Sequence, residues 1–123
     1  MELHYLGTSG PNNTANYEPR IDGVKIGEVQ LRHRTAKSEK LPEGFESNVY
    51  YEIDPAFQGK GYAKESLKLL LEEARKVPLS EIIIVARESN IASQKVIEAN
   101  GGEWLASKTD AEGIVHKKYR IVL

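Results

Sequence analysis

Cysteine is absent from the 123-residue chain, which excludes disulfides, thiolate metal sites and a cysteine nucleophile. No apolar run approaches the roughly 18 residues that a membrane-spanning helix requires. The first residues, Met1 to Tyr5, lack the basic and apolar regions of a signal peptide. We therefore expect a cytoplasmic protein with no membrane partner.

An excess of charge of either sign is also missing. The chain has 17 basic and 18 acidic residues, a net charge of −1, so we expect no attraction to nucleic acid. Hydrophobic residues make up 40%, enough for one core, and the length predicts a single domain over residues 1–123. The three histidines show no metal-ligand spacing, so no metal is expected, and His4 and His116 are expected at the surface.

The sequence pattern predicts an α/β (α+β) domain with a mixed sheet. Strands are expected at 3–6, 17–21, 24–34, 48–54, 82–86, 102–107 and 115–123, and helices at 61–77 and 90–100. Asp22-Gly23 predicts a tight hairpin turn, and a shift of the apolar phase at Gly27 indicates a β-bulge. The apolar run at 82–86 follows a strand and a helix, which predicts one right-handed βαβ unit.

The segment between the strand 48–54 and the helix 61–77 carries the strongest chemical signal. It reads Gln58-Gly59-Lys60-Gly61-Tyr62-Ala63, and its glycines allow a sharp turn and close approach to a ligand. No Ser, Thr, Asp or Asn stands just before Gly61, so the first helical amides still need an acceptor. A pyrophosphate is the natural occupant of such a helix start. The Walker and dinucleotide loops are excluded, because no Ser or Thr follows Lys60 and no third glycine follows Gly61 at the required spacing.

Gln58, Gly61 and Ala63 fit the pattern Gln/Arg-x-x-Gly-x-Gly/Ala, which resembles the coenzyme A loop of the GNAT superfamily of N-acetyltransferases. Asn90 and Ser93, followed by Gly101-Gly102, resemble the second motif of that family. The segments 26–33 and 118–123 resemble strands of a short bacterial subgroup of predicted acetyltransferases. The resemblance covers about residues 17–123. It implies a GNAT-like, largely antiparallel mixed sheet with a central βαβ unit.

The resemblance also implies the reaction. Acetyl-CoA, the co-substrate, would insert between the splayed strands 48–54 and 81–86, and a primary amine of a small molecule or peptide would attack it directly. The loop amides would hold the pyrophosphate, and backbone near Ile53 and the side chains of the second motif would contact the pantetheine arm. The residues implied in cofactor binding are Ile53, Gln58, Gly59, Lys60, Gly61, Tyr62, Ala63, Asn90 and Ser93.

Three residues are candidates for catalysis. Glu52 is the best candidate for the base, with a solvated strand carboxylate as an equal alternative. His33 falls on the same face of its predicted strand as Val29 and Leu31, so its side chain is a candidate for the cleft. A structural role is favoured over this one. Many relatives carry a tyrosine acid where this chain has Ile97. Ser93 is its weak replacement, or the thiolate leaves unaided. Asn90 has the alternative of being only a helix cap.

The chain departs from the family near its beginning. Residues 7–17 are too short, and too rich in Gly, Pro and Asn, for the helices that wall the amine site in relatives. The wall would then come from the 35–46 loop or from a second copy of the chain in a homodimer. Five carboxylates of the 35–46 loop and the strand that follows it would favour a cationic amine if they line the cleft: Glu39, Glu43, Glu46, Glu52 and Asp54. The alternatives to an enzyme are a non-catalytic acetyl-CoA-binding module and a related domain that binds no cofactor. Tyr50 and Tyr51 are interpreted as sheet packing.

Overall fold

The computed structural model describes residues 1–33, 35, 41–77 and 79–123. The strands are β1 Glu2–Ser9, β2 Thr14–Ile21, β3 Val24–Lys25, β4 Gly27–Arg32, β5 Val49–Ile53, β6 Glu81–Arg87, β7 Glu103–Thr109 and β8 Val115–Val122. The helices are α1 Tyr62–Ala74 and α2 Ile91–Ala99, with a short 3₁₀ turn, η1, at Pro55–Phe57. These bounds agree with the predicted elements to within a few residues everywhere except at the N-terminus.

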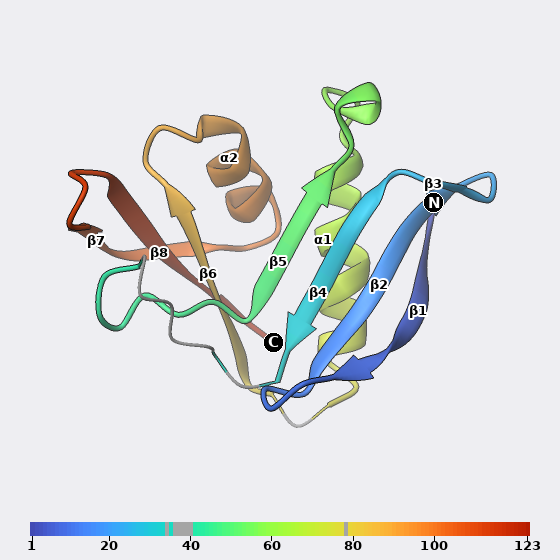
Figure 1. The fold of residues 1–123 in the computed structure, drawn as a ribbon, viewed down its shortest axis with the longest axis horizontal. Helices are drawn as coiled ribbons and strands as arrows, with labels where there is room; N and C mark the ends of the chain where they lie inside the picture. Colours follow the sequence, from blue (N-terminus) through green and yellow to red (C-terminus); the bar gives the residue numbers. More distant parts are fainter. Residues whose placement is uncertain (34, 36–40, 78) are drawn as a thin grey trace.

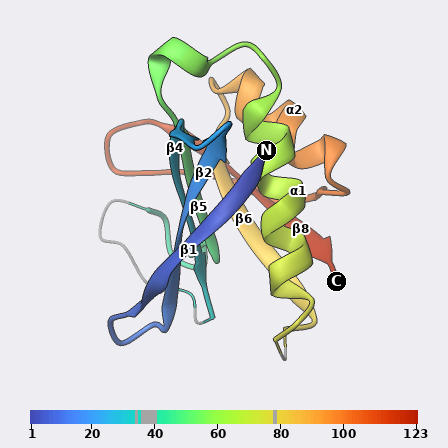
Figure 2. The ribbon, with the colours of Figure 1, turned by 90° about the vertical axis from the view of Figure 1, so that its right-hand side faces the viewer.

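The strands form two sheets that meet at β5 and β6 (Figure 1). One has the order β1-β2-β4-β5, with β3 on β2, and the other has the order β6-β8-β7. Every pair in these sheets is antiparallel. Both helices lie on the same side of the strands, and α1 connects β5 to β6 (Figure 2). The predicted α+β fold with its central βαβ unit is confirmed.

The predicted hairpin turn and bulge are both present. Asp22 and Gly23 have φ values of 50° and 79°, the two positive angles that a two-residue turn of this kind requires. The pairing register of β2 then moves by one residue, from Arg20 opposite Lys25 to Tyr17 opposite Val29. A Cβ added to Gly27 would lie 2.1 Å from the carbonyl oxygen of Glu52, so only glycine lets β4 approach β5 this closely.

The N-terminal region is more regular than its sequence suggested. Strand β1 extends to Ser9 and β2 begins at Thr14, so much of the predicted loop 8–14 is a hairpin. A register shift between Tyr5 and Gly7, where Gly7 has a φ of 120°, keeps the strands paired. Residues 7–17 contain no helix, as expected from their length and composition.

The core lies between the helices and the strands. Helix α1 buries Leu67, Leu70, Leu71 and Ala74, and α2 buries Ile97. They pack in one cluster with apolar residues of β4, β6 and β8: Val29, Leu31, Ile82, Ile84, Tyr119 and Ile121. None of the helices in the described part of the chain has the length and apolar character that crossing a bilayer demands.

Candidate active site

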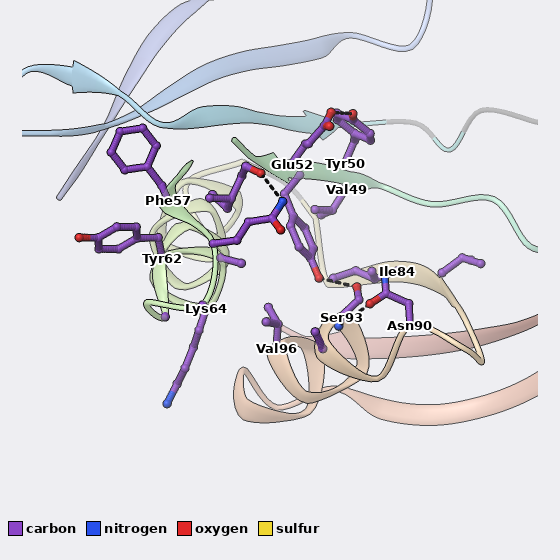
Figure 3. A pocket seen from close by; sticks show the side chains of 18 residues that line it. Val49, Tyr50, Glu52, Phe57, Tyr62, Lys64, Ile84, Asn90, Ser93 and Val96 are labelled. Carbon is purple, nitrogen blue, oxygen red and sulfur yellow. Dashed lines mark hydrogen bonds between the residues drawn. The ribbon is translucent and has the colours of Figure 1, made fainter. Parts of the chain in front are cut away.

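The two sheets are joined through Ser47 and Asn48, which both bond Ile83, and they separate beyond these residues. Asn48 donates its backbone N–H to the carbonyl of Ile83 at 2.8 Å, and its side-chain Oδ1 accepts the Ile83 N–H at 2.9 Å. The same side chain donates Nδ2 to the carbonyl of Arg32 on β4, at 3.0 Å. Beyond this point, β5 and β6 share no backbone ladder among the described residues. A cavity of about 550 Å³ opens between them (Figure 3).

The glycine loop borders one end of this cavity. Gly61 is the N-cap residue of α1, has a φ of 81° and makes no side-chain cap. The first helical bond is donated by Glu65 to the carbonyl of Gly61, at 3.2 Å. Within the described residues, the amides of Gly59, Gly61, Tyr62 and Ala63 donate to no other group. A Cβ added at either glycine would meet nothing within 4 Å, so open space faces these donors, as an anionic ligand requires.

The other loop residues divide between structural and cavity-lining positions. Gln58 donates Nε2 to the carbonyl of Ile53 at 2.8 Å, which ties the loop to the end of β5. That carbonyl is therefore occupied. The antiparallel alternation with β4 directs the N–H of Ile53 toward the cleft. Lys60 does not line the cavity, whereas Lys64, in the first turn of α1, does. The sequence analysis missed Lys64, although its position in the first turn after the loop was a signal.

The second motif lies on the opposite wall of the cavity. Asn90 caps α2 by accepting the Ser93 N–H at 3.0 Å, and both residues line the cavity (Figure 3). The cap that the sequence offered as an alternative is thus present, and it leaves Asn90 in the cavity wall. Ile97 is fully buried in the core and cannot supply a polar group to the site.

Tyr51 is a site residue that the sequence analysis assigned to packing. Its hydroxyl lies 2.6 Å from Ser93 Oγ, across the gap between β5 and α2. Burial raises the pKa of the Tyr51 phenol, and the hydrogen bond to Ser93 lowers it by less. The hydroxyl therefore remains protonated at neutral pH and can donate a hydrogen bond.

Glu52 and Tyr50 lie on the opposite face of β5 from Tyr51, as the two-residue period of a strand dictates. The Tyr50 hydroxyl donates to Glu52 Oε2 at 2.6 Å, and the two side chains lie together in Figure 3. This bond is the main reason that the pKa of Tyr50 is raised, with burial second. Glu52 lines the cavity but is exposed, so the base and the solvated carboxylate both stay open as hypotheses.

The structure does not bring His33 to this site. Its Nδ1 lies 2.5 Å from the carbonyl oxygen of Asn13, and the ring lines a separate hollow near Tyr17 and Leu31. The expectation that it points into the cleft is corrected, because β4 ends at Arg32 and the face it shares with Leu31 packs toward α1. His33 occupies the structural position that the sequence favoured.

A second cavity of about 830 Å³ lies on the other side of Tyr50. Val49, Tyr50 and Val85 line both cavities, so the two are neighbours separated by one layer of side chains. Its outer walls are residues 41–43 and the turn at 109–114 between β7 and β8. The described part of the predicted 35–46 loop therefore does reach the cleft, and residues 36–40, including Glu39, lie outside the described residues.

Phe45 fixes this loop wall on the second sheet. Its ring is buried, and the amino groups of Lys108 and Lys118 lie 5.7 and 6.0 Å from the ring centre. The same lysines donate to the carbonyls of Glu43 and Gly44, each at 3.0 Å. Two cation–π contacts and two hydrogen bonds thus hold the wall across a sequence gap of more than sixty residues.

His116 is buried, so the expectation of a surface histidine is wrong. Its Nε2 lies 2.8 Å from Asp110 Oδ2, and Asp110 Oδ1 accepts the amides of Glu112 and Ile114 at 2.8 and 3.0 Å. The hydrogen bond with His116 is the largest cause that lowers the pKa of the Asp110 carboxyl. The pair orders the 109–114 turn, and within the described residues no three His, Asp or Glu side chains gather as a metal site would need.

Comparison with known proteins supports this geometry. Residues 10–103 match the family described as the acetyltransferase (GNAT) domain. A [ribosomal protein bS18]-alanine N-acetyltransferase from Haemophilus ducreyi is 37% identical over 49 residues, which is 40% of this chain and 34% of that protein. This chain thus spans about a third of that relative.

Solved structures show the same fold. The ribosomal L7/L12 alpha-N-protein acetyltransferase RimL, in complex with coenzyme A, superposes with a TM-score of 0.72 at 21% identity, over 89% of this chain and 62% of that one. The aminoglycoside acetyltransferase AAC(6')-Ib, in complex with coenzyme A and kanamycin, superposes with a TM-score of 0.70 at 17% identity, over 90% and 67%. The family match covers most of the sequence and includes the loop, the splayed strands and the second motif. This chain belongs to the GNAT acetyltransferase family.

Proposed function

We propose that this chain is a single-domain N-acetyltransferase that moves an acetyl group from acetyl-CoA to a primary amine. The observation that carries the proposal is the set of unpaired amides at the start of α1, which face a cavity between two diverging strands. Relatives bound to coenzyme A share the fold, and the named relatives modify protein N-termini or aminoglycosides. The shared fold and the reactions of these relatives both support an amine as the acceptor.

The binding roles follow from position in the cavity. The amides of Gly59, Gly61, Tyr62 and Ala63 would hold the diphosphate, with Lys64 adding a positive charge beside them. The N–H of Ile53 and the polar groups of Asn90 and Ser93 lie further along the cavity, where the pantetheine arm would run. Gln58 keeps the loop in place through Ile53, and Lys60 faces solvent.

The reaction needs two proton movements. A neutral amine nitrogen attacks the thioester carbonyl carbon and gives up a proton as the C–N bond forms. The C–S bond then breaks, and the departing thiolate takes up a proton. We assign proton removal from the amine to Glu52, whose carboxylate lines the first cavity and accepts the hydroxyl of Tyr50, a residue that lines both cavities. Glu52→Gln should lower kcat by about 100-fold at neutral pH. An unchanged kcat would leave the solvated-carboxylate hypothesis in its place.

Stabilisation of the departing sulfur is assigned to the Tyr51–Ser93 pair. If Tyr51 donates to Ser93 Oγ, the serine proton is left to point at the sulfur. The pair then supplies a hydrogen-bond donor, which many relatives take from a tyrosine at the position of Ile97. A thiolate with a pKa near 8.5 needs only a hydrogen bond to leave at a useful rate.

The second cavity is assigned to the amine acceptor. It adjoins the first at Tyr50, and the loop at residues 41–43 provides a wall where relatives use N-terminal helices. This arrangement completes the site within one chain, so the homodimer of the sequence analysis is not needed for the acceptor wall.

The experiment that tests the proposal is incubation with acetyl-CoA and a panel of amines, with release of free thiol followed over time. An N-acetyltransferase releases thiol and forms an N-acetyl product with at least one amine, in equal amounts. Tight coenzyme A binding without thiol release for any amine would instead favour the non-catalytic module. The absent helices and the apolar Ile97 are the observations behind that second candidate.

A further inference from the structure

From the charges that line the second cavity, we infer that the acceptor is an amine accompanied by a carboxylate a few atoms away, rather than a polyamine. The inference rests on the proposed function, because it assumes that this cavity receives the acceptor. It differs from the simpler expectation, based on the carboxylates in the sequence alone, that the acceptor is a plain cation.

Cations and anions line the cavity in similar numbers. Arg32 and Arg87 contribute positive charge, and Glu43, Asp110 and Glu112 contribute negative charge. The Asp110 carboxylate is already used, since it accepts two amides and the His116 ring nitrogen. Two arginines and two glutamates therefore remain to meet a ligand.

The arginines are suitably placed to bind a carboxylate. Arg87 is exposed at the end of β6, and among the described residues no carboxylate lies within ion-pairing distance of it. Arg32 directs Nη1 to the carbonyl oxygen of Ser47 at 3.4 Å, a long contact that leaves most of its donors available. A guanidinium can bind both oxygens of a carboxylate at once, which gives geometric selectivity as well as attraction.

A polyamine would meet the opposite situation. Each additional ammonium group would enter a cavity that already carries the two arginines, and like charges at short range repel. A single amine beside a carboxylate instead meets the glutamates with its nitrogen and the arginines with its oxygens. Two sources share this chemistry: a free amino acid, and a peptide whose free N-terminus is followed by an acidic side chain.

The test compares four acceptors with the full chain and acetyl-CoA. They are free aspartate, a short peptide beginning Ala-Asp, the same peptide with Lys in place of Asp, and spermidine. We expect kcat/KM for at least one of the first two to exceed the values for the Lys peptide and spermidine by about tenfold, equivalent to ~1.4 kcal/mol. Which of the first two is preferred identifies the source.

Arg87→Glu is the variant that tests the assigned charge, and Arg75→Glu is its matched control. Arg75 is exposed at the end of α1 and lines neither cavity, so the same charge change there should preserve the preference. Arg87→Glu should reduce the preference for the acidic acceptor to about unity or reverse it. A wild-type preference for spermidine or the Lys peptide, or an unchanged preference in Arg87→Glu, would overturn the inference.

Binding measurements decide the inference separately from catalysis. Calorimetry on the protein saturated with coenzyme A should detect tighter binding of the acidic peptide than of the Lys peptide, and Arg87→Glu should remove the difference. If thiol release fails for every amine but this difference is present, the proposed function fails and the charge assignment stands. If thiol release succeeds but this difference is absent, only the inference fails.

Discussion

Strand β5 has a neighbour on each side, and the two relationships differ. Toward β4 it forms a regular antiparallel ladder from Val49 to Ile53, closed by the tight contact at Gly27. Toward β6, bonds among the described residues come only from Ser47 and Asn48, just before β5 begins, and the strands then part. The ladder with β4 holds β5 in place, and the open edge toward β6 leaves room for the cavity. The site therefore depends on the incomplete pairing between β5 and β6.

The unpaired edge of β5 also explains why the cavity can hold a ligand. The edge of β5 that faces β6 keeps backbone groups without a strand partner, and the start of α1 adds the unpaired amides of the loop. A ligand that lies between the strands would supply acceptors and donors to these backbone groups.

Gly61→Glu should have the largest effect on the open side. A carboxylate there would occupy the space in front of the loop amides and repel a diphosphate. We expect coenzyme A affinity to fall by at least about 100-fold in calorimetry, while circular dichroism stays near that of the wild type. Gly61→Ala is the control, since it introduces the same left-handed strain of about 1 kcal/mol without the charge. Equal losses in both variants would mean that backbone strain, not the anion site, explains the effect.

Asn48→Ala should weaken the junction between the two sides. It would leave the N–H of Ile83 and the carbonyl of Arg32 without partners in a buried position. We expect the free energy of unfolding, measured in urea, to fall by about 2–4 kcal/mol.

Asn48→Asp sharpens this test, because it keeps the acceptor for Ile83 but places an oxygen against the carbonyl of Arg32. It should be no more stable than Asn48→Ala. Wild-type stability in either variant would show that Asn48 is not what joins the sheets.

Tyr51→Phe should affect turnover across the open side but leave binding intact. Removing the hydroxyl frees Ser93 Oγ from its 2.6 Å partner, so we expect kcat to fall by about tenfold with little change in coenzyme A affinity. Tyr5→Phe is the matched control, because it removes a hydroxyl that bonds Thr8 on β1 and lies outside both cavities. A loss of affinity in Tyr51→Phe equal to its loss of kcat would indicate that Tyr51 only shapes the cavity.

Asp110→Asn should give the smallest effect, confined to the turn that walls the second cavity. The folded-state pKa of Asp110 is lowered, so its carboxylate contributes stability above the usual aspartate pKa, and this contribution is lost as the pH falls through the lowered value. Urea midpoints of variant and wild type should therefore differ at pH 7, and the difference should shrink only as the pH falls below the usual aspartate pKa. A difference that is constant with pH would contradict this assignment of charge.

The sequence was sufficient for features whose chemistry is local. The Asp22-Gly23 turn, the uncapped start of α1 and the cap of α2 by Asn90 each depend on a few adjacent residues, and each was predicted. The Gly27 bulge was visible as a break in an alternating pattern.

Long-range partners could not be read in the same way. Tyr51 meets Ser93 forty-two residues away, and Asn48 meets Ile83 thirty-five residues away. The buried position of His116 depends on its contact with Asp110 across the turn between β7 and β8. The cleft alternative for His33 was wrong for a related reason, since the strand phase indicated a face but not which cavity that face borders. These contacts follow from the packing of the sheets, which no local pattern specifies.

Truncated ligands show whether the amides at the start of α1 bind a diphosphate. Calorimetry should compare dephospho-coenzyme A, which keeps the diphosphate, with 4′-phosphopantetheine, which does not. If these amides bind the diphosphate, one dephospho-coenzyme A should bind per chain, and the affinity for phosphopantetheine should be at least about 100-fold weaker. Equal affinities for the two, or no heat from dephospho-coenzyme A at millimolar concentration, would contradict diphosphate binding by these amides.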